Sequence, residues 1–267
     1  MSVRVNGNSV TPTAAKQRKI LALLALNAGR VVSTTTLTEE LWGDAPPASS
    51  AAALQTYILQ LRKRLSAGPR QLIATYHGGY LLQDAPCRTD ISELDRYVRP
   101  GRAAAESGDY RTASDLLTRA LALWRGPALS DVPPGRILEI EAISLEETRM
   151  GILERRVEAD LALGRHADLL SELRLLTARH PMSENLSRFL MISLYRSGHS
   201  GRALSEYHRL RATLQAELGI DPSPRLQQLH DAILTHSPSL DNDHQIHHPR
   251  IFTDLSTLAS ASSRRGC

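Results

Sequence analysis

The sequence predicts a mainly α protein in two parts, a small N-terminal domain of three helices with β-hairpins and a larger all-α domain. Three observations predict this organisation. Residues 1–90 mix helical apolar periodicity with short extended runs around Asn-Gly and Gly-Gly pairs. From residue 91 onward the periodicity is helical almost throughout. Within that second part, a repeat of 34 residues relates Gly164 to Gly198.

The segment from Ser49 to Leu65 organises the first domain. Ser49 and Ser50 are candidate caps for a helix that begins at Ala51. At 100° per residue, four apolar side chains share one face, namely Leu54, Ile58, Leu61 and Leu65. The opposite face carries small, amide, hydroxyl and cationic groups, namely Ala52, Thr56, Leu59, Gln60 and Lys63, with Arg62 and Arg64 on the flanks. A helix in a major groove needs this mixture, because phosphate contacts position the protein and base-edge contacts specify the site.

The same helix has a plainer interpretation as a solvated face with favourable charge at its C-terminus, and for the helix alone that interpretation is the commoner one. The residues that follow favour DNA binding. After a break at Gly68-Pro69, residues 72–82 hold two short apolar runs around Gly78-Gly79, which predict a β-hairpin. Helix, break and hairpin follow each other in the order of a winged helix-turn-helix module.

The residues before this segment predict the remaining elements of that module. Residues 3–10 alternate around Asn6-Gly7, a pair that favours a type I′ turn and hence a hairpin. Thr13 is expected to cap a helix over residues 14–27, which Gly29 ends. Val31-Val32 predicts a short strand, and Ser33 is expected to cap a second helix that continues to Trp42.

Three aromatic side chains and one histidine of the module were weighed as contacts. Trp42, at a helix end, is expected to close the small core rather than to bind a partner. Tyr76 and Tyr80 of the hairpin can touch DNA, but packing against the third helix accounts for them equally well. His77, at the tip of the hairpin, is the better candidate for a DNA contact.

Positive charge is concentrated in the first third of the chain. Residues 1–90 hold ten Lys/Arg and five Asp/Glu, so their net charge is 10 − 5 = +5. Residues 91–235 hold nineteen and twenty, a net of −1, and residues 236–267 hold three of each. A small nucleic-acid-binding module joined to a neutral partner domain would show this asymmetry.

The second part of the chain reads as stacked helical hairpins. At the offset of 34 residues, Leu170, Ser171, Glu172 and Leu176 match Leu204, Ser205, Glu206 and Leu210. This is the period of tetratricopeptide repeats. Residues 105–121 have a similar pattern around Gly108, and Pro100-Gly101 predicts a kink or an interruption in the preceding helix.

These patterns predict three segments: residues 1–86 as the winged helix-turn-helix domain, residues 91–235 as the tetratricopeptide-like domain, and residues 236–267 as a disordered tail. Residues 83–90 form a short connector. We expect the first domain to dock on the helix around Ile91–Val98.

The sequence carries no recognisable catalytic motif, phosphate-binding loop or dinucleotide fingerprint, so a non-enzyme without cofactor or metal is expected. The carboxylate pairs Glu139/Glu141 and Glu146/Glu147 are typical of solvated helix surface. His244, His247 and His248 lie in the tail without supporting ligands. Cys87 and Cys267 have no metal-ligand spacing, and no disulfide is expected. With no apolar run of membrane-spanning length and no signal peptide, a soluble, cytoplasmic and nucleoid-associated protein is expected.

Several segments, taken together, resemble the Streptomyces antibiotic regulatory protein family. The DNA-binding half of that family resembles this chain at residues 11–26, 41–47, 54–65 and 79–82. The family's bacterial transcriptional activation domain resembles it at residues 120–129, 159–166, 194–198 and 217–222. The resemblance covers about residues 3–235. It implies a pathway-specific activator of a secondary-metabolite gene cluster, binding direct repeats at promoters as a dimer and recruiting RNA polymerase. The family usually opens with a fuller sheet than the residues before Thr11 provide, so a sheet reduced to one hairpin, or a late start, is expected.

The predicted partners are therefore double-stranded DNA and RNA polymerase. The candidate DNA contacts are Gln55, Thr56, Gln60, Arg62, Lys63, Arg64 and His77. Two alternatives use the same modules, a helical-repeat adaptor and a repressor. The charge distribution favours DNA binding over the adaptor, since an adaptor has no reason to concentrate positive charge near the third helix.

Overall fold

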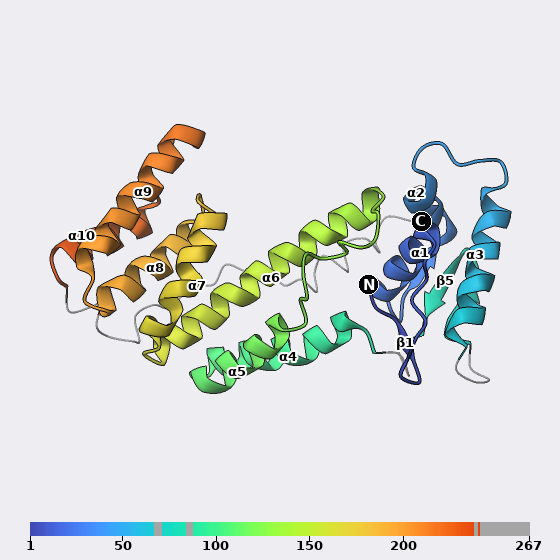
Figure 1. Cartoon of the computed structure of the whole chain (residues 1–267), viewed down its shortest axis with the longest axis horizontal. Coiled ribbons are helices and arrows are strands. Elements are labelled where there is room, and N and C mark those ends of the chain that lie inside the picture. The colour runs from blue at the N-terminus through green and yellow to red at the C-terminus, as the bar shows by residue number, and fades with distance from the viewer. Residues whose placement is uncertain (67–70, 84–87, 238–239, 241–267) are drawn as a thin grey trace, which may run out of the picture. The chain divides into compact units, whose positions relative to one another are not determined.

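A computed structural model describes residues 1–66, 71–83, 88–237 and 240, and it is mainly helical with two small antiparallel sheets (Figure 1). The fold class expected from the sequence is thereby confirmed. Contacts divide the chain into two compact units, Met1–Ala159 and Asp160–Cys267. The predicted segment boundaries at residues 86, 91 and 235 stay predictions. Cys87, Cys267, His244, His247, His248, Gly68-Pro69 and nearly all of the predicted tail lie outside the described residues.

The first hairpin consists of β1 (Arg4–Val5) and β2 (Asn8–Ser9), paired Arg4 with Ser9 and Val5 with Asn8. Asn6 and Gly7 connect the strands with φ angles of 50° and 83°. Both central residues of a type I′ turn need positive φ, which explains the Asn-Gly pair and confirms the predicted hairpin.

Helices α1 (Ala15–Leu26), α2 (Thr34–Trp42) and α3 (Ser50–Leu65) follow the predicted periodicity, but the predicted Thr13 cap is wrong and the Ser49 cap is confirmed in position only. Ala14, not Thr13, occupies the N-cap position of α1, without a side-chain bond. Ser49 takes the N-cap position of α3, yet its side chain makes no capping bond there. The Ser33 cap of α2 is confirmed, because its hydroxyl accepts a hydrogen bond from the Thr36 N–H at 3.0 Å.

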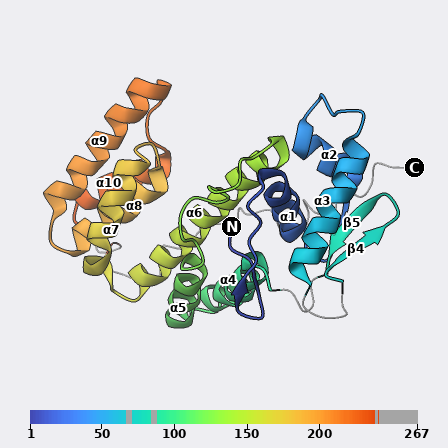
Figure 2. The ribbon, with the colours of Figure 1, turned by 45° about the vertical axis from the view of Figure 1, so that its right-hand side comes forward.

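A three-stranded sheet joins the predicted hairpin to the segment before α2. Its strands are β3 (Val31–Ser33), β4 (Ile73–Tyr76) and β5 (Gly79–Leu82), in the order β3-β5-β4. Gly79 allows the close pairing of β3 with β5, because a Cβ atom there would lie 2.4 Å from the carbonyl oxygen of Val32. The second view shows the hairpin of β4 and β5 beside α3 (Figure 2).

One apolar core holds α1, α2, α3 and the sheet together and extends beyond residue 82. Its buried members include Ile20, Leu24, Leu37, Leu54, Ile58, Leu61, Ile73, Val132 and Leu138. Leu138 lies in α6 (Arg136–Ala162). Trp42 is partly buried against this core, as expected, and the Lys16 ammonium lies 4.7 Å from its ring centre.

The expected docking of the first domain on residues 91–98 stays a prediction. Leu94 and Val98 of α4 (Asp90–Glu106) pack inward with Leu117 of α5 (Tyr110–Leu121) and Ile152 of α6. The apolar core of the first 82 residues also extends to Val132 and to Leu138 near the start of α6.

Helix α4 runs through Pro100 without the expected interruption. Pro100 is exposed, so its ring meets solvent on the outer side of the helix. Gly101 is buried against α5, and a Cβ atom there would lie 3.1 Å from Cδ2 of Leu117. The Pro-Gly pair therefore combines a solvent-facing ring with a close helix–helix contact.

Three turns between consecutive helices share one backbone geometry. Gly108, Gly164 and Gly198 have φ angles of 81°, 75° and 77°. After each glycine, the next N–H donates to the carbonyl five residues earlier, at 2.9, 3.0 and 2.8 Å. Glycine suits the left-handed conformation that this turn requires. The predicted repeat is thus visible in the backbone.

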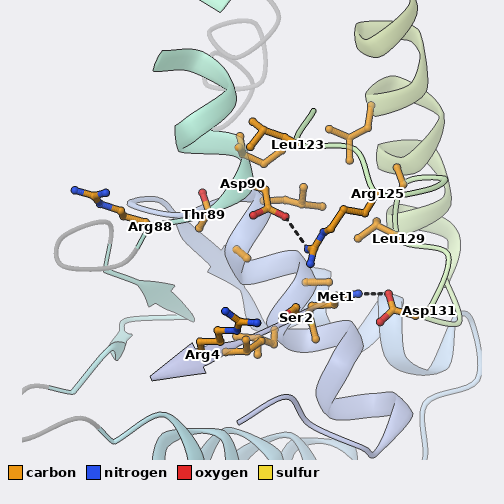
Figure 3. A pocket seen from close by; sticks show the side chains of 18 of the residues that line it. Met1, Ser2, Arg4, Arg88, Thr89, Asp90, Leu123, Arg125, Leu129 and Asp131 are labelled. Atoms are coloured by element: carbon orange, nitrogen blue, oxygen red, sulfur yellow. Dashed lines mark hydrogen bonds and ion pairs between the residues drawn. The ribbon is translucent and has the colours of Figure 1, made fainter. Parts of the chain in front are cut away.

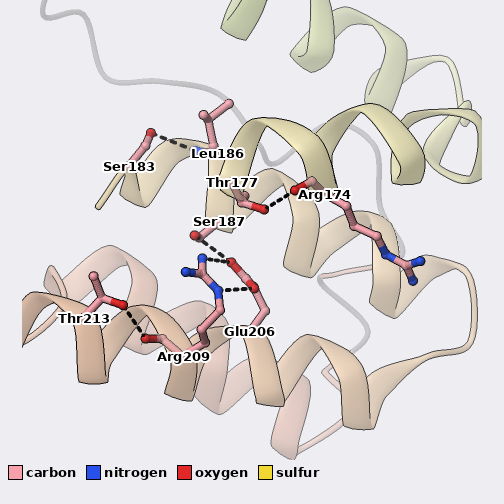
Figure 4. A network of polar contacts seen from close by, with 8 residues as sticks. All are labelled: Arg174, Thr177, Ser183, Leu186, Ser187, Glu206, Arg209 and Thr213. Carbon is pink, nitrogen blue, oxygen red and sulfur yellow. Dashed lines mark hydrogen bonds and ion pairs between the residues drawn. The ribbon is translucent and has the colours of Figure 1, made fainter. Parts of the chain in front are cut away.

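The second unit contains α7 (His166–Arg179), α8 (Glu184–Arg196), α9 (Ser200–Leu218) and α10 (Pro224–Leu234). A polar network crosses its core (Figure 4). Ser187 of α8 donates to Glu206 of α9 at 2.9 Å, and Arg209 donates twice to the same carboxylate. These bonds to Glu206 raise the pKa of Arg209 and satisfy a carboxylate that is 9% exposed.

One carboxylate expected on solvated surface has a structural partner. Glu146 of α6 accepts a hydrogen bond from the backbone N–H of Ala128 at 2.7 Å. The side chain thereby holds the loop before α6 onto the helix. Glu147 is exposed, and so is Glu139, as the expectation for solvated surface requires.

Candidate nucleic-acid interface

Helix α3 presents one buried face and one exposed face, as the periodicity predicted. Leu54, Ile58, Leu61 and Leu65 are each at most 3% exposed. The exposed residues lie on the opposite side and its flanks: Ala51, Ala52, Gln55, Thr56, Leu59, Gln60, Lys63 and Arg64. Leu59 is 52% exposed and gives this face an apolar spot, the kind of group that meets a thymine methyl.

One flank of α3 is tied to the hairpin of β4 and β5, which we call the wing. Nε of Arg62 donates to the carbonyl of Ile73 at 2.9 Å, and Nη2 donates to Oγ1 of Thr75 at 2.6 Å. The guanidinium also lies 5.9 Å from the ring centre of Tyr80. Arg62 was predicted as a phosphate contact, and the structure places it as a brace between α3 and the wing.

The other flank of α3 is tied to the segment around α1. Gln60 accepts a hydrogen bond from Nε2 of Gln17, which is buried. Nη1 of Arg64 donates to the carbonyl of Thr11 at 3.3 Å. Because these bonds and those of Arg62 lie on opposite flanks, α3 is held from both sides.

The centre of the exposed face makes few contacts with the rest of the described chain. Thr56 donates to the carbonyl of Ala52 at 2.9 Å, so its oxygen keeps acceptor capacity. Gln55 and Lys63 are exposed, and within the part of the chain that the structure describes their side chains make no hydrogen bond or ion pair. An amide, a hydroxyl and an ammonium thus face outward together from a helix that is braced on both flanks.

The wing tip lies against the start of α2. The N–H of Thr34 donates to the carbonyl of Gly78 at 2.8 Å, and His77 is exposed at the turn. Of the two interpretations left open for the tyrosines, packing holds for Tyr80, which is 7% exposed and lies in the core, whereas Tyr76 is 52% exposed. His77 is therefore placed where the sequence expected a contact residue.

Sequence reasoning missed the exposed hydroxyls in the first turn of α2, beside the wing. Thr34 and Thr35 are exposed, while the N–H groups of Thr34 and Thr36 already donate to the carbonyl of Gly78 and the hydroxyl of Ser33. The signal was present in the run Ser33-Thr-Thr-Thr36, where one cap residue is followed by hydroxyls in the first turn.

The described residues contain no cluster of three or more His, Cys, Asp or Glu side chains placed to hold a metal ion. Across residues 1–66, 71–83 and 88–237, no helix has the length and apolarity needed to span a membrane.

Comparison with known families and structures agrees with this architecture. The model for the C-terminal domain of transcriptional regulatory proteins matches residues 8–82. The model for the bacterial transcriptional activator domain matches residues 89–234. Together with the winged-helix fold, these matches define a transcriptional regulator with two modules.

The chain belongs to the Streptomyces antibiotic regulatory protein family. It is 49% identical to the regulatory protein DnrI of Streptomyces peucetius over 89% of this chain and 90% of DnrI. It is 38% identical to the transcriptional regulator RedD of Streptomyces coelicolor, covering 85% of this chain and 66% of RedD. It is 39% identical to the regulatory protein AfsR of the same species, but spans 23% of AfsR.

A solved structure shares the fold. The chain superimposes on Mycobacterium tuberculosis EmbR, determined in complex with a low-affinity phosphopeptide, with a TM-score of 0.86 and 30% identity. The match covers 98% of this chain and 68% of the EmbR chain.

Proposed function

We propose that this protein activates transcription of a secondary-metabolite gene cluster by binding direct repeats at a promoter as a dimer and recruiting RNA polymerase. The observation that carries the proposal is the exposed row of Gln55, Thr56 and Lys63 on a helix braced from both flanks. An amide and a hydroxyl can read base edges, and the ammonium can meet phosphate.

Bracing supports this assignment energetically. A recognition helix that is already held in place loses less conformational entropy when it binds. The wing and the first turn of α2 add His77, Thr34 and Thr35 as further contacts beside the same helix. The net charge of +5 over residues 1–90 supports attraction to a phosphate backbone, and the neutral remainder supports a protein-facing role.

The small DNA-contacting surface of one protomer supports binding by two protomers. One recognition helix and one wing cover little DNA, and a single small module rarely reaches operator-level discrimination. Stacked helical hairpins leave extended surfaces that need not serve the core, which suits contacts with a neighbouring protomer and with RNA polymerase. We further propose that the protein has no catalytic activity and acts at the nucleoid.

Gel-shift titration on fragments from the surrounding gene cluster tests the DNA contact. Thr56→Ala is expected to reduce discrimination between sites by about 1–3 kcal/mol, the value of one base contact. Thr118→Ala, an exposed threonine of α5, is the matched control and should change nothing. Equal discrimination by both variants would contradict the assignment of α3.

Run-off transcription with purified RNA polymerase and the full chain separates the alternatives. An activator raises transcript yield at saturating occupancy, whereas a repressor lowers it and an adaptor shows no specific DNA binding at all. Footprints of one protomer on a single half-site, as tight as on the tandem site, would contradict binding as a dimer.

A further inference from the structure

A cavity of about 840 Å3 lies within the first unit, between the N-terminal hairpin, α1 and α4 (Figure 3). Its walls are largely apolar and include Leu21, Ala25, Leu72, Leu94, Leu123 and Leu145. Pockets of roughly 300–1,000 Å3 with apolar walls and a few polar groups are typical of small-molecule sites. The cavity lies away from the exposed face of α3, since Leu65 of the buried face is among its lining residues.

Two carboxylates at this cavity have ion-pair partners, whereas one arginine of the lining has none among the described residues. Asp90 is paired with Arg125 at 3.6 Å, and Asp131 is paired with the N-terminal ammonium of Met1. Both carboxylates therefore already have cations (Figure 3). Arg4 lines the same cavity, and among the described residues it has no ion-pair partner.

Arg88, another cation that lines the cavity, is less available to a ligand inside it. It is 82% exposed, lies 3.9 Å from Glu93, and extends away from the other labelled side chains in Figure 3. Arg4 is thus the cation available to a ligand. A site with apolar walls and one uncompensated cation favours a molecule with an apolar body and one negative charge.

We propose that this cavity binds a small organic anion, with its apolar body against Leu21, Leu72 and Leu94 and its carboxylate, sulfonate or phenolate group against Arg4. Such a ligand would contact both the module that carries α3 and the first helix of the activator domain. The proposal concerns ligand binding itself and does not depend on whether the protein binds DNA.

Anilinonaphthalene sulfonate is a suitable probe, because it combines an aromatic body with a single sulfonate and fluoresces when it leaves water. Titration of the full chain without DNA is expected to give saturable binding of one dye per chain. Raising the ionic strength should weaken that binding, because Arg4 is exposed and its charge is screened.

Two variants test the site from different sides. Gly126→Trp adds an indole at a lining residue where an added Cβ atom meets nothing within 4 Å, so the substitution creates no clash at that atom. Its matched control is Gly201→Trp, an exposed position in the second unit with equally open space. Arg4→Gln removes the cation, with the exposed Arg30→Gln as its control.

We expect Gly126→Trp and Arg4→Gln each to lower dye affinity by about tenfold, the effect of losing one good charged or packing contact. Arg4→Gln should also flatten the salt dependence, and both controls should bind like the parent chain. Circular dichroism melts confirm that each variant is folded.

Three results would overturn the proposal. They are non-saturable dye binding, equal binding by Gly126→Trp and Gly201→Trp, and a salt dependence that survives Arg4→Gln. Each result would place the dye on another apolar surface.

Discussion

The carboxylate of Glu40, in α2, accepts a hydrogen bond at 3.0 Å from the backbone N–H of Leu138, in α6, across 98 residues of sequence. The same carboxylate accepts from the N–H groups of Ile137 at 3.0 Å and Gly135 at 2.5 Å. Glu40 is 1% exposed, and Nζ of Lys19 lies 3.8 Å from Oε1. A side chain from the winged-helix module therefore caps a helix of the region that matches the activator domain.

Glu40→Ala is expected to lower the free energy of unfolding by about 3 kcal/mol, because one buried and two part-buried N–H groups and Lys19 lose their acceptor. Glu39→Ala is the matched control. Glu39 is 41% exposed and faces Arg136 at 3.5 Å, so its loss should cost less than about 1 kcal/mol. Urea unfolding of both variants measures the difference. Equal midpoints would show that the cap contributes nothing.

Arg62→Ala is expected to change the stability of the protein, whereas Lys63→Ala is expected to change its binding to DNA, although the two residues are adjacent. Arg62→Ala removes two hydrogen bonds to the wing and should lower thermal stability by about 1–2 kcal/mol. Lys63→Ala should leave stability unchanged and reduce the salt slope of DNA binding by about 0.9, the value for one phosphate contact. Calorimetry and gel shifts over a salt series separate the effects. A stability loss in Lys63→Ala would contradict this division.

Asp109 is expected to make the free energy of unfolding depend on pH. Its side chain caps α5, and the side-chain and backbone bonds from Thr112 lower the pKa of Asp109 below its usual value. A lowered folded-state pKa adds stability that is present above the unfolded-state pKa of about 4 and lost as pH falls through the folded-state pKa. Asp109→Asn keeps a capping side chain without this titration. Melts should therefore show the parent more stable than Asp109→Asn at neutral pH, with the gap closing on acidification.

Pro100→Ala is expected to stabilise the protein. Alanine in a helix interior is favoured over proline by about 3 kcal/mol, while the unfolded chain regains entropy worth about 1 kcal/mol. The net expectation is a gain of about 2 kcal/mol in the free energy of unfolding. Arg99→Ala, an exposed neighbour, should stay within about 0.5 kcal/mol of the parent. A destabilised Pro100→Ala would show that the packing of Gly101 on Leu117 requires the proline.

Sequence alone predicted what depends on local periodicity. Leu54, Ile58, Leu61 and Leu65 are buried because an amphipathic helix has one way to cover an apolar stripe. The turn at Asn6-Gly7 and the repeated turn glycines follow from φ requirements that few residues meet.

What sequence did not predict depends on partners far along the chain. Gln60 and Arg64 find theirs 43 and 53 residues away, and no local pattern reveals such a bond. Glu40 did leave a signal. It stands between Leu37 and Leu41 on the buried face of α2, where a carboxylate needs a partner. The pairing of β3 with β5 likewise rests on a backbone approach at Gly79 that periodicity does not encode.

The hydrogen bonds on both flanks of α3 affect how the sequence of such a regulator can diverge. Arg62, Gln60 and Arg64 hold the helix, while Gln55, Thr56 and Lys63 contribute little to the fold. Exposed positions of this kind tolerate substitution at nearly constant stability. If α3 reads DNA as proposed, a duplicated copy can change its operator through two or three surface substitutions and still reach the same fold. Under the proposed function, this arrangement lets new biosynthetic clusters acquire dedicated regulators without rebuilding the protein.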